Sequence, residues 1–252
     1  MNRSNPNAKI RTRTNRNLDK VYIIIPVLNE EESLAKVIHG FIKEGVPSSN
    51  IIVVDNGSTD DSSAVARHSG TKLLYEPKIG YGSACLAGLN FLENSDHEPE
   101  YIVFADGDDS DDSEDLFKLL QQFRNFPETD IAIGTRTQGG AEKGSLSFLQ
   151  KFGNSLTCYL LKIFYRQKFT DLGPFRVIRW KSLRLLNLED KTWGWNIEMQ
   201  IRSIQKGLNI VEIPVHYKRR KLGKSKISGN VIGSIKAGSR ILWIFFKLTL
   251  FH

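Results

Sequence analysis

The sequence is poor in cysteine and lacks a long apolar run. Its two cysteines, Cys85 and Cys158, lie in apolar surroundings and are too few for a disulfide framework, so we expect a reducing compartment. Residues 1–20 contain no apolar segment, and for this reason we expect no secretory signal. The longest uncharged apolar run, Ile241–Phe246, is much shorter than the roughly 20 residues of a membrane span. This end of the chain should therefore not cross a bilayer by itself.

Acidic side chains are almost absent from the two ends of the chain. Residues 1–20 hold six basic residues and one acidic residue, and residues 216–252 hold nine basic residues and no acidic one. The net charge of +7 therefore conceals an acidic body between residues 21 and 215. A nucleic-acid-binding protein usually carries its basic patch on the folded domain, so this distribution argues against nucleic acid as a partner. It favours a body that holds cations and ends that meet a membrane surface or a phosphate.

The remaining composition is typical of a globular α/β protein. The 252 residues are 40% hydrophobic and 25% charged, which excludes wholesale disorder, and a chain of this size can bury about 70% of its unfolded surface. Short β-branched runs alternate with helical patterns, which predicts a mostly parallel sheet with helices on both faces. The predicted strands are Val21–Val27, Ile51–Val54, Lys72–Tyr75, Tyr101–Ala105, Asp130–Thr135 and Asn209–Tyr217. Pro214 favours an edge position for the last of them.

We divide the chain into three parts. Residues 1–20 are predicted to be a disordered basic arm, and residues 21–226 form the α/β domain. Residues 227–252 carry one rough apolar stripe with basic residues elsewhere, which predicts an amphipathic segment at a membrane interface. The alternative for this segment is a helix that packs on the core or forms a dimer contact.

Polar residues follow four of the predicted strands. Because ligands of open parallel sheets bind beyond the carboxyl ends of the strands, these residues should form one binding rim. They are Asn29 and Glu30, Asp55 to Asp60, Asp106 to Asp109, and Arg136. Turn and helix-capping chemistry explains residues 56–60. It does not explain Asp55, whose carboxylate can accept hydrogen bonds from a nucleobase or a ribose hydroxyl.

Asp106 and Asp108 form an Asp-x-Asp pair at the end of a predicted strand. Two carboxylates in this arrangement can share one hard cation and leave coordination positions open for phosphate oxygens. Seven of the ten residues from Asp106 to Asp115 are acidic, so their joint ionisation is costly without a cation or a neighbouring basic side chain. The alternative is a solvated acidic loop that charges the first turn of the next helix. A calcium EF-hand is a poor match, because Asp111 and Phe117 occupy its glycine and glutamate positions.

Two further segments carry weaker signals. The turn Lys78–Gly82 contains two glycines and leads into a predicted helix, an arrangement compatible with a phosphate cradle. The aromatic segment Trp193–Trp195 either sets substrate preference or packs in the core.

In their order and spacing, the motifs resemble family 2 glycosyltransferases, which have the GT-A fold and work by inversion. The residues that carry this resemblance are Ile24–Glu31, Val53–Asp60, Gly80–Ala84 and Asp106–Asp108. A second set resembles the branch that transfers mannose or glucose to polyprenyl phosphates such as undecaprenyl or dolichyl phosphate. This set comprises Gly134–Arg136, Phe175-Arg176, Glu212–Val215 and Arg220–Lys226. Together the motifs cover about residues 20–228.

The resemblance implies a role for each matching residue. Asp55 would contact the nucleobase, with Pro26 and Glu30 lining the base and ribose, and Lys78 and Gly80 would lie on the same donor side. Asp106 and Asp108 would hold Mg²⁺ or Mn²⁺ and, through it, the diphosphate of a UDP- or GDP-hexose. The cations that receive the lipid phosphate and the donor phosphates would be Arg136, Arg220 and Lys226.

The chain departs from the family pattern at three places. Lys78 stands where many relatives have Asn or Arg, and Ser113 stands where a proline usually follows the acidic motif. Residues 171–176 form an approach to Phe175-Arg176 that is one residue tighter than usual, on the acceptor side.

The acceptor decides whether a general base is needed. A phosphate monoester is mostly dianionic at pH 7 and can attack without a base, but it needs a basic pocket. Arg136 and the basic run Lys218–Lys226 suit that purpose, the latter as a mobile loop over the substrate or as a solvated run. A hydroxyl acceptor would instead require a base, for which Asp171 and Glu198 are both candidates.

The sequence therefore predicts a metal-dependent, inverting hexosyltransferase. It would transfer a hexose from a nucleotide sugar to a polyprenyl phosphate, bound peripherally at the cytoplasmic, inner face of a membrane, with room for an integral-membrane partner. One alternative is an enzyme of the same fold that acts on a hydroxyl of a glycan, a glycolipid or a small molecule. The other is a non-catalytic nucleotide-binding scaffold.

Overall fold

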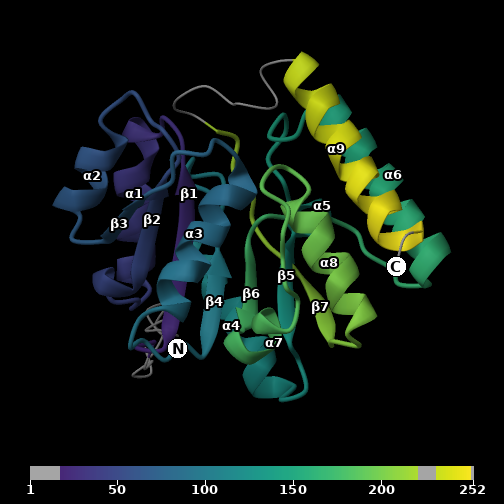
Figure 1. The fold of residues 1–252 in the computed structure, drawn as a ribbon, viewed down its shortest axis with the longest axis horizontal. Coiled ribbons are helices and arrows are strands. Elements are labelled where there is room, and N and C mark those ends of the chain that lie inside the picture. Colours follow the sequence, from purple (N-terminus) through teal and green to yellow (C-terminus); the bar gives the residue numbers. More distant parts are fainter. Residues whose placement is uncertain (1–17, 221–230, 251–252) are drawn as a thin grey trace, which may run out of the picture.

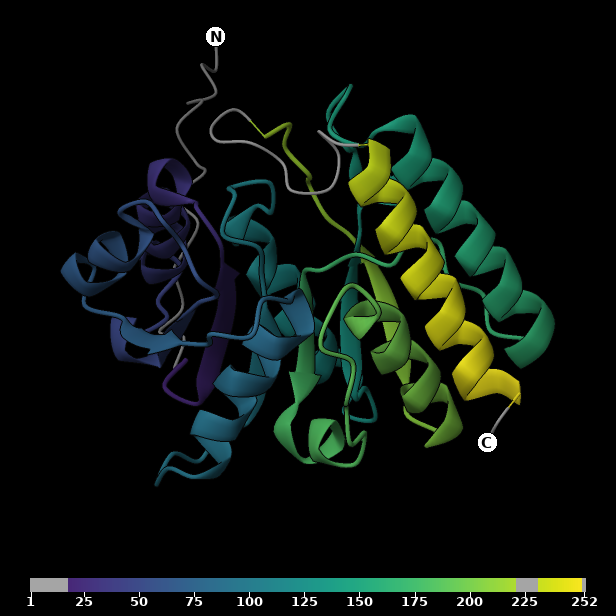
Figure 2. The same cartoon turned by 45° about the horizontal axis from the view of Figure 1, so that its top comes forward.

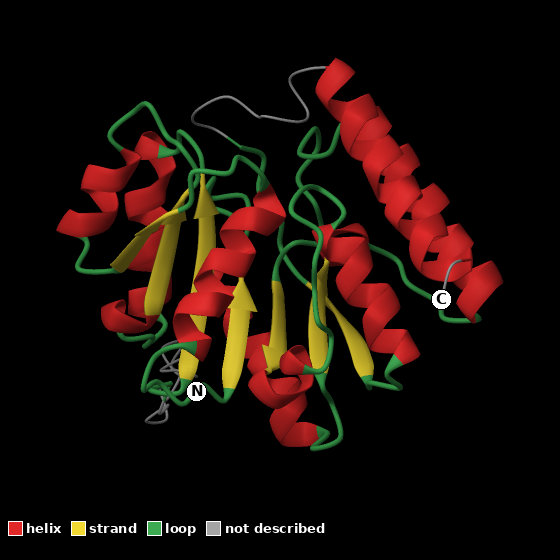
Figure 3. Cartoon of the chain, in the orientation of Figure 1, coloured by secondary structure: helices red, strands yellow, loops and turns green. Residues whose placement is uncertain are grey.

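The structure, a computed structural model, describes residues 18–220 and 231–250. Its centre is a seven-stranded sheet with the order β3-β2-β1-β4-β6-β5-β7, covered by helices (Figures 1 and 3). The strands are β1 Val21–Val27, β2 Ile51–Asp55, β3 Lys72–Tyr75, β4 Tyr101–Phe104, β5 Ile131–Thr135, β6 Arg176–Arg179 and β7 Ile210–Pro214. The α-helices are α1 Glu31–Lys43, α2 Ser62–His68, α3 Tyr81–Glu93, α4 Leu116–Asn125, α5 Arg136–Gly139, α6 Phe148–Tyr165, α7 Trp180–Arg184, α8 Trp195–Gln205 and α9 Val231–Leu250. Short 3-10 helices occupy Ser48–Asn50 and Ser113–Asp115.

The sheet is mostly parallel, as the sequence predicts. β1 pairs in parallel with β2 and β4, and β2 does so with β3. β6 runs antiparallel to both β4 and β5, so β5 and its parallel neighbour β7 point the same way as β4 (Figure 3). The carboxyl ends of all strands except β6 therefore meet at one edge of the sheet. β7 is an edge strand, which confirms the inference from Pro214.

The sheet separates two apolar cores. Successive side chains of a strand point to opposite faces, so Ile23 and Ile25 face the core made with α1, α2 and α4. Ile24 faces the other core, to which α3, α6, α8 and α9 contribute. All three of these side chains are fully buried. The central strand β1 is thus apolar on both sides, as expected of a parallel strand covered by helices.

α9 forms a third layer with α6. The two helices lie side by side, and α9 also packs against α8 (Figures 1 and 2). The ring of Phe245, which is fully buried, meets Phe164 and Tyr165 edge-on at centroid distances of 5.5 and 6.3 Å. The inner side of α9 thus follows the core-packing alternative for the C-terminal segment, whereas Ile235 and Trp243 remain exposed. Residues 227–230 and 251–252 of that predicted segment lie outside the described residues.

Within residues 18–220 and 231–250, no helix has the length and apolarity that a membrane crossing requires.

Candidate active site

The carboxyl ends of the strands open into one cleft of about 440 Å³. Its floor and rim come from residues that directly follow β1, β2, β4 and β5, and from the segment after β7. α6 and α9 supply a further wall. The residues that line it include Pro26, Glu30, Asn56, Gly80, Asp106, Asp108, Arg136, Leu149, Gly153, Thr192, Trp193, Trp195, Asn196, Tyr217, Arg220, Ala237 and Gly238. The cleft thus contains most of the residues that the sequence singles out.

Acidic side chains gather at the end of β4. Asp108 Oδ1 accepts a hydrogen bond from Ser110 N at 3.0 Å, and the N–H of Asp106 donates to Asp111 Oδ2 at 3.2 Å. Burial, followed by the charges of Asp111 and Asp108, raises the pKa of Asp106 well above its ordinary value. Burial likewise raises the pKa of Asp111 to about 7. Removing these carboxylates from water opposes their ionisation, so a bound cation would relieve a real electrostatic cost.

The acidic residues fit a divalent ion of the kind that shares its coordination with a substrate. Among the described residues, no three Asp, Glu, His or Cys side chains converge on one cation. A site with two carboxylates suits Mg²⁺ or Mn²⁺, because such ions often take their other ligands from phosphate oxygens and water. Asp111 Oδ1 is buried and has no hydrogen-bond partner in the described part of the chain, so a nearby cation would satisfy an otherwise unpaired oxygen.

Arg220 spans the cleft between two of the predicted residues. Its guanidinium forms an ion pair with Glu30 and lies 3.5 Å from Asp108 Oδ2. Arg220 therefore joins the acid that follows β1 to an acid that follows β4.

Arg136 is held by several hydrogen bonds to one acidic partner. Its Nε and Nη2 atoms each lie 2.7 Å from the carboxylate of Asp171, and its backbone N–H donates to the same group at 2.8 Å. The guanidinium also lies 5.1 Å from the centroid of the Tyr217 ring. This pairing raises the pKa of Arg136 against the effect of burial, so the group is a permanent cation. Asp171 is fully buried beneath it and is engaged as a counter-ion.

The end of β2 is an internally bonded turn. Asp55 is buried, accepts a hydrogen bond from Ser58 N at 2.8 Å and binds Ser63 Oγ. It does not line the cleft, whereas its neighbour Asn56 does. The amide of Asn56 donates to the carbonyl oxygens of Glu76 and Lys78 at 2.9 Å each. Asn56, which the sequence explains as a turn residue, thus also ties β2 to the segment before α3.

The glycine turn before α3 does not expose a set of free N–H groups. Gly80 N donates to Asn56 Oδ1 at 2.7 Å, and the N–H groups of Gly82 and Ser83 donate to carbonyl oxygens of residues 192 and 191. The phosphate-cradle interpretation of this turn is therefore not supported. Gly80 still lines the cleft, whereas the exposed side chain of Lys78 does not.

Glu198 lies outside the cleft. It is buried on α8, accepts hydrogen bonds from the backbone N–H groups of Glu189 and Asp190, and pairs with Arg202 at 2.8 Å. Its contacts hold a loop in place, so the structure places it with the scaffold rather than with the reacting groups. Lys226 lies outside the described residues.

Two polar atoms beside the cleft have no hydrogen-bond partner within residues 18–220 and 231–250, one on Trp195, which the sequence singles out, and one on Asn196, which it does not. Trp195 is fully buried and packs edge-on against Phe104, yet its Nε1 has no hydrogen-bond partner among the described residues, and neither has Asn196 Oδ1. Buried polar atoms normally have partners, so two unsatisfied groups beside a cleft suit a ligand rich in hydroxyls. In the sequence, the segment Trp193–Trp195 leaves substrate preference and core packing equally open, whereas nothing points to Asn196.

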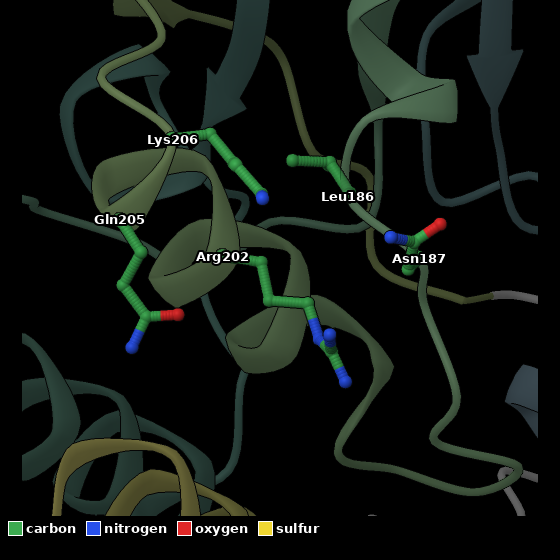
Figure 4. Close-up of a pocket in the computed structure, with 5 residues that line it drawn as sticks. All are labelled: Leu186, Asn187, Arg202, Gln205 and Lys206. Atoms are coloured by element: carbon green, nitrogen blue, oxygen red, sulfur yellow. The ribbon is translucent and has the colours of Figure 1, made fainter. Parts of the chain in front are cut away.

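A second pocket, of about 430 Å³, lies at the carboxyl end of α8. Figure 4 shows Arg202 of α8 and Lys206, which directly follows the helix, extending toward Leu186 and Asn187, with Gln205 on the other side. None of the sequence-predicted residues lies there, so the cleft is the candidate active site.

The comparisons with known proteins agree with this geometry. The model of Glycosyl transferase family 2 matches residues 22–189, the region that supplies β1 to β6 and most of the cleft. The chain belongs to this family. It is a glycosyltransferase, and the resemblance inferred from its motifs is confirmed.

Several relatives match along most of their length. An uncharacterized glycosyltransferase of Mycobacterium tuberculosis is 33% identical over 87% of this chain and 94% of the relative. The undecaprenyl-phosphate mannosyltransferase of Micrococcus luteus is 32% identical over 85% and 90%, and the polyprenol monophosphomannose synthase of Mycolicibacterium smegmatis is 28% identical over 87% and 85%. The match thus extends to relatives named for polyprenyl-phosphate mannosyl transfer.

A solved structure shows the same fold. Glucosyl-3-phosphoglycerate synthase from Mycobacterium tuberculosis, in complex with Mn²⁺, UDP and phosphoglyceric acid, superposes with a TM-score of 0.71 at 17% identity, over 92% of this chain and 79% of that one. The glycosyltransferase described here therefore has a GT-A-like fold, as predicted.

Proposed function

We propose that this glycosyltransferase moves a hexose from UDP- or GDP-hexose to a polyprenyl phosphate, with inversion and with Mg²⁺ or Mn²⁺ bound. The observation that carries the proposal is the composition of one cleft. Its floor holds Asp106 and Asp108, its rim holds Arg136 and Arg220, and its outer wall is built from α6 and α9. Relatives named for mannosyl transfer to undecaprenyl phosphate and polyprenol support the same substrate class.

The donor side is assigned to the ends of β1, β2 and β4. A divalent ion between Asp106, Asp108 and the donor would neutralise charge that develops on the leaving diphosphate. Pro26 and Glu30 would line the nucleoside, with Asp55 behind them shaping the turn at the end of β2. The unsatisfied polar atoms of Trp195 and Asn196 would face the hexose hydroxyls.

The acceptor side is assigned to the arginines. Arg136 is held in one position by Asp171, so it offers a fixed positive charge at the cleft. Arg220 would exchange its acidic partners for phosphate when the donor and its metal are bound, and Lys226 would add a further cation. A phosphate oxygen then attacks C1 of the hexose while the bond from C1 to the diphosphate oxygen breaks, and no proton has to move.

Two observations favour phosphate over a hydroxyl as the acceptor. Asp171 is buried, and its carboxylate is paired with Arg136. Glu198 is buried outside the cleft, where it accepts hydrogen bonds from a backbone loop. Neither of the two candidate bases is thus placed to take a proton from a sugar or glycolipid hydroxyl. A dianionic phosphate needs no such base.

The outer faces of α6 and α9 support a peripheral membrane contact. Neither helix contains an acidic residue, and both expose large apolar side chains beside lysines. The exposed apolar residues are Phe148, Leu149, Phe152, Tyr159, Ile163 and Phe164 on α6, and Ile235, Trp243, Phe246 and Leu250 on α9. We call them the α6/α9 surface. Such a surface would lie at the inner, cytoplasmic leaflet, beside the cleft wall of small residues Gly153, Ala237 and Gly238, and an integral-membrane partner could adjoin it.

A transfer assay tests the proposal. The full chain would be incubated with Mn²⁺ or Mg²⁺, labelled UDP-glucose or GDP-mannose, and either undecaprenyl phosphate, dolichyl phosphate or an alcohol such as undecaprenol. We expect a labelled lipid that forms only with a phosphate acceptor and only with a divalent ion. Transfer to the alcohol or to a soluble sugar, with none to the phosphates, would overturn the choice of acceptor. Tight nucleotide binding without any transfer would favour the scaffold.

A further inference from the structure

The segment 189–194, between α7 and α8, is organised by a buried carboxylate. Asp190 Oδ1 accepts hydrogen bonds from the backbone N–H groups of Thr192 and Gly194 at 2.8 and 3.0 Å, and from Thr192 Oγ1 at 3.1 Å. The side chain of Asp190 has no exposed surface. A carboxylate that is buried in this way needs a positively charged partner. The element that supplies this partner is the one to which the segment is attached.

That partner comes from α9. Arg240 donates from Nε and Nη2 to Asp190 Oδ2 at 2.9 and 2.6 Å, although the two residues are 50 positions apart. A Cβ at Gly194 would lie 2.6 Å from Ile244 Cγ1, so only glycine allows this close approach of the segment to α9. The guanidinium of Arg240 also lies 4.6 Å from the ring centroid of Trp243, which belongs to the α6/α9 surface.

The backbone of the same segment contacts the first turn of α3. Lys191 O accepts the N–H of Ser83 at 3.0 Å, and Thr192 O accepts the N–H of Gly82 at 3.3 Å. These N–H groups would otherwise be unpaired at the helix N-terminus. The segment therefore holds α3 by hydrogen bonds while α9 holds the segment by an ion pair.

The contact between the segment and α3 is unusually close. A Cβ at Gly80 would lie 2.1 Å from Lys191 O, and one at Gly82 would lie 1.9 Å from Asp190 O. Gly80 and Trp193 both line the cleft, Gly80 on the side where the resemblance puts the donor. A shift of the segment would therefore change the shape of the cleft wall directly.

We propose that Arg240 and Asp190 are positioning residues for the donor, a nucleoside diphosphate sugar. Through this ion pair, α9 holds the segment 189–194 in contact with α3. The contact fixes the positions of Gly80 and Trp193 in the cleft wall. The identity of the ligand rests on the proposed function, but the coupling itself does not. α9, which carries part of the α6/α9 surface, then also determines the shape of the donor pocket.

Hydrogen exchange and nucleotide binding together test the coupling. In the full-length Arg240→Gln variant, we expect faster amide exchange in the peptide that contains Gly82 and Ser83, because the segment that accepts their hydrogen bonds is released. We expect the affinity for UDP or GDP with Mn²⁺ to fall about tenfold, as when a supporting partner of a bound ligand is lost. Arg240→Lys should recover part of the affinity, since it keeps the charge but not the two-pronged geometry.

The matched control is Lys236→Gln, which removes an exposed charge from the same helix. It should change neither exchange at α3 nor nucleotide affinity. If Arg240→Gln lowers only the melting temperature and leaves both readouts at the wild-type values, the ion pair merely stabilises the fold and the proposal is wrong. The same holds if exchange increases but affinity does not change. Failure of the wild type to bind any nucleotide would contradict the proposed function instead, and exchange at Gly82 and Ser83 would still decide whether α9 is coupled to α3.

A double-mutant cycle provides a second measurement. If Arg240 acts through Asp190, the variant Asp190→Asn combined with Arg240→Gln should bind nucleotide no more weakly than the more affected single variant. Additive losses would mean that the two side chains act independently, and this would overturn the proposal.

Discussion

Arg220 lies 3.5 Å from Asp108 and is also paired with Glu30, so one cation bridges the acids at the end of β4 and the acid at the end of β1. The chain segments involved are far apart, with 190 positions between Glu30 and Arg220. A divalent ion at Asp108 would compete with this guanidinium. Donor binding and release of Arg220 toward an acceptor phosphate are therefore expected to be linked.

Replacement of Arg220 by alanine should separate the two substrates. We expect the rate of transfer to polyprenyl phosphate to fall about 100-fold or more, because the acceptor loses a charge that balances its own. Binding of the nucleotide with Mn²⁺ should change little, since the variant also removes a competitor of the metal. Transfer rates and calorimetry check this, with Lys181→Ala on α7 as a control for an exposed cation outside the cleft. Unchanged transfer by Arg220→Ala would remove Arg220 from the acceptor site.

Replacement of Glu198 by glutamine distinguishes the two acceptor classes. Glu198 holds backbone N–H groups and Arg202, so its loss should cost roughly 1.5–3 kcal/mol of unfolding free energy, as for hydrogen bonds to charged groups. We expect the folded variant to retain a measurable transfer rate to the lipid phosphate. A near-complete loss of kcat with unchanged stability would identify Glu198 as a base and favour a hydroxyl acceptor. Denaturant unfolding and steady-state kinetics provide both numbers.

The pH dependence of metal binding follows from the acidic cluster. Asp111 has a pKa of about 7, raised by burial, and Asp106 is also raised well above the ordinary value. A carboxyl with a raised pKa resists ionisation, so the metal-free protein should lose stability as the pH rises from about 4 through 7. A cation binds the ionised carboxylates. Protonation of one carboxylate with a pKa near 7 should therefore weaken Mn²⁺ binding about tenfold when the pH falls from 8 to 6. An affinity for Mn²⁺ that does not change over this pH range would contradict the assignment of the metal site to this acidic cluster.

Membrane contact can be tested without turnover. Replacement of Phe152 and Ile235 by serine removes two exposed apolar side chains from the α6/α9 surface without opening the core. We expect weaker sedimentation with vesicles that contain anionic lipid, together with unchanged nucleotide binding. The matched control, Phe126→Ser, removes an exposed ring after α4 and away from α6 and α9. Equal vesicle binding by both variants would show that the α6/α9 surface is not the contact.

The sequence predicts those parts of the fold that local patterns determine. β1 and β2 are apolar runs that end at turn residues, so both strands and the residues beyond them could be placed without a structure. β6 could not, because Arg176–Arg179 has only four residues and begins and ends with arginine. Its pairing with β4 and β5 decides that it is a strand, and this information is not local.

The same distinction holds for the candidate site. Asp106, Asp108 and Arg136 directly follow strands, and the topology brings them to one edge of the sheet. Contacts across the chain were not predictable, because they depend on how helices dock. The pairing of Asp190 with Arg240 is one such contact, and the engagement of Asp171 by Arg136 is another.

The central claim is that Asp106 and Asp108 hold a divalent ion that binds the donor diphosphate. Calorimetry of the Asp106→Asn plus Asp108→Asn variant with UDP or GDP, with and without Mn²⁺, tests it most directly. We predict that the wild type binds nucleotide tightly only with Mn²⁺, and that the variant loses this metal-dependent gain, about 100-fold or more. A folded variant that binds nucleotide with the wild-type Kd and the same Mn²⁺ dependence would contradict the claim.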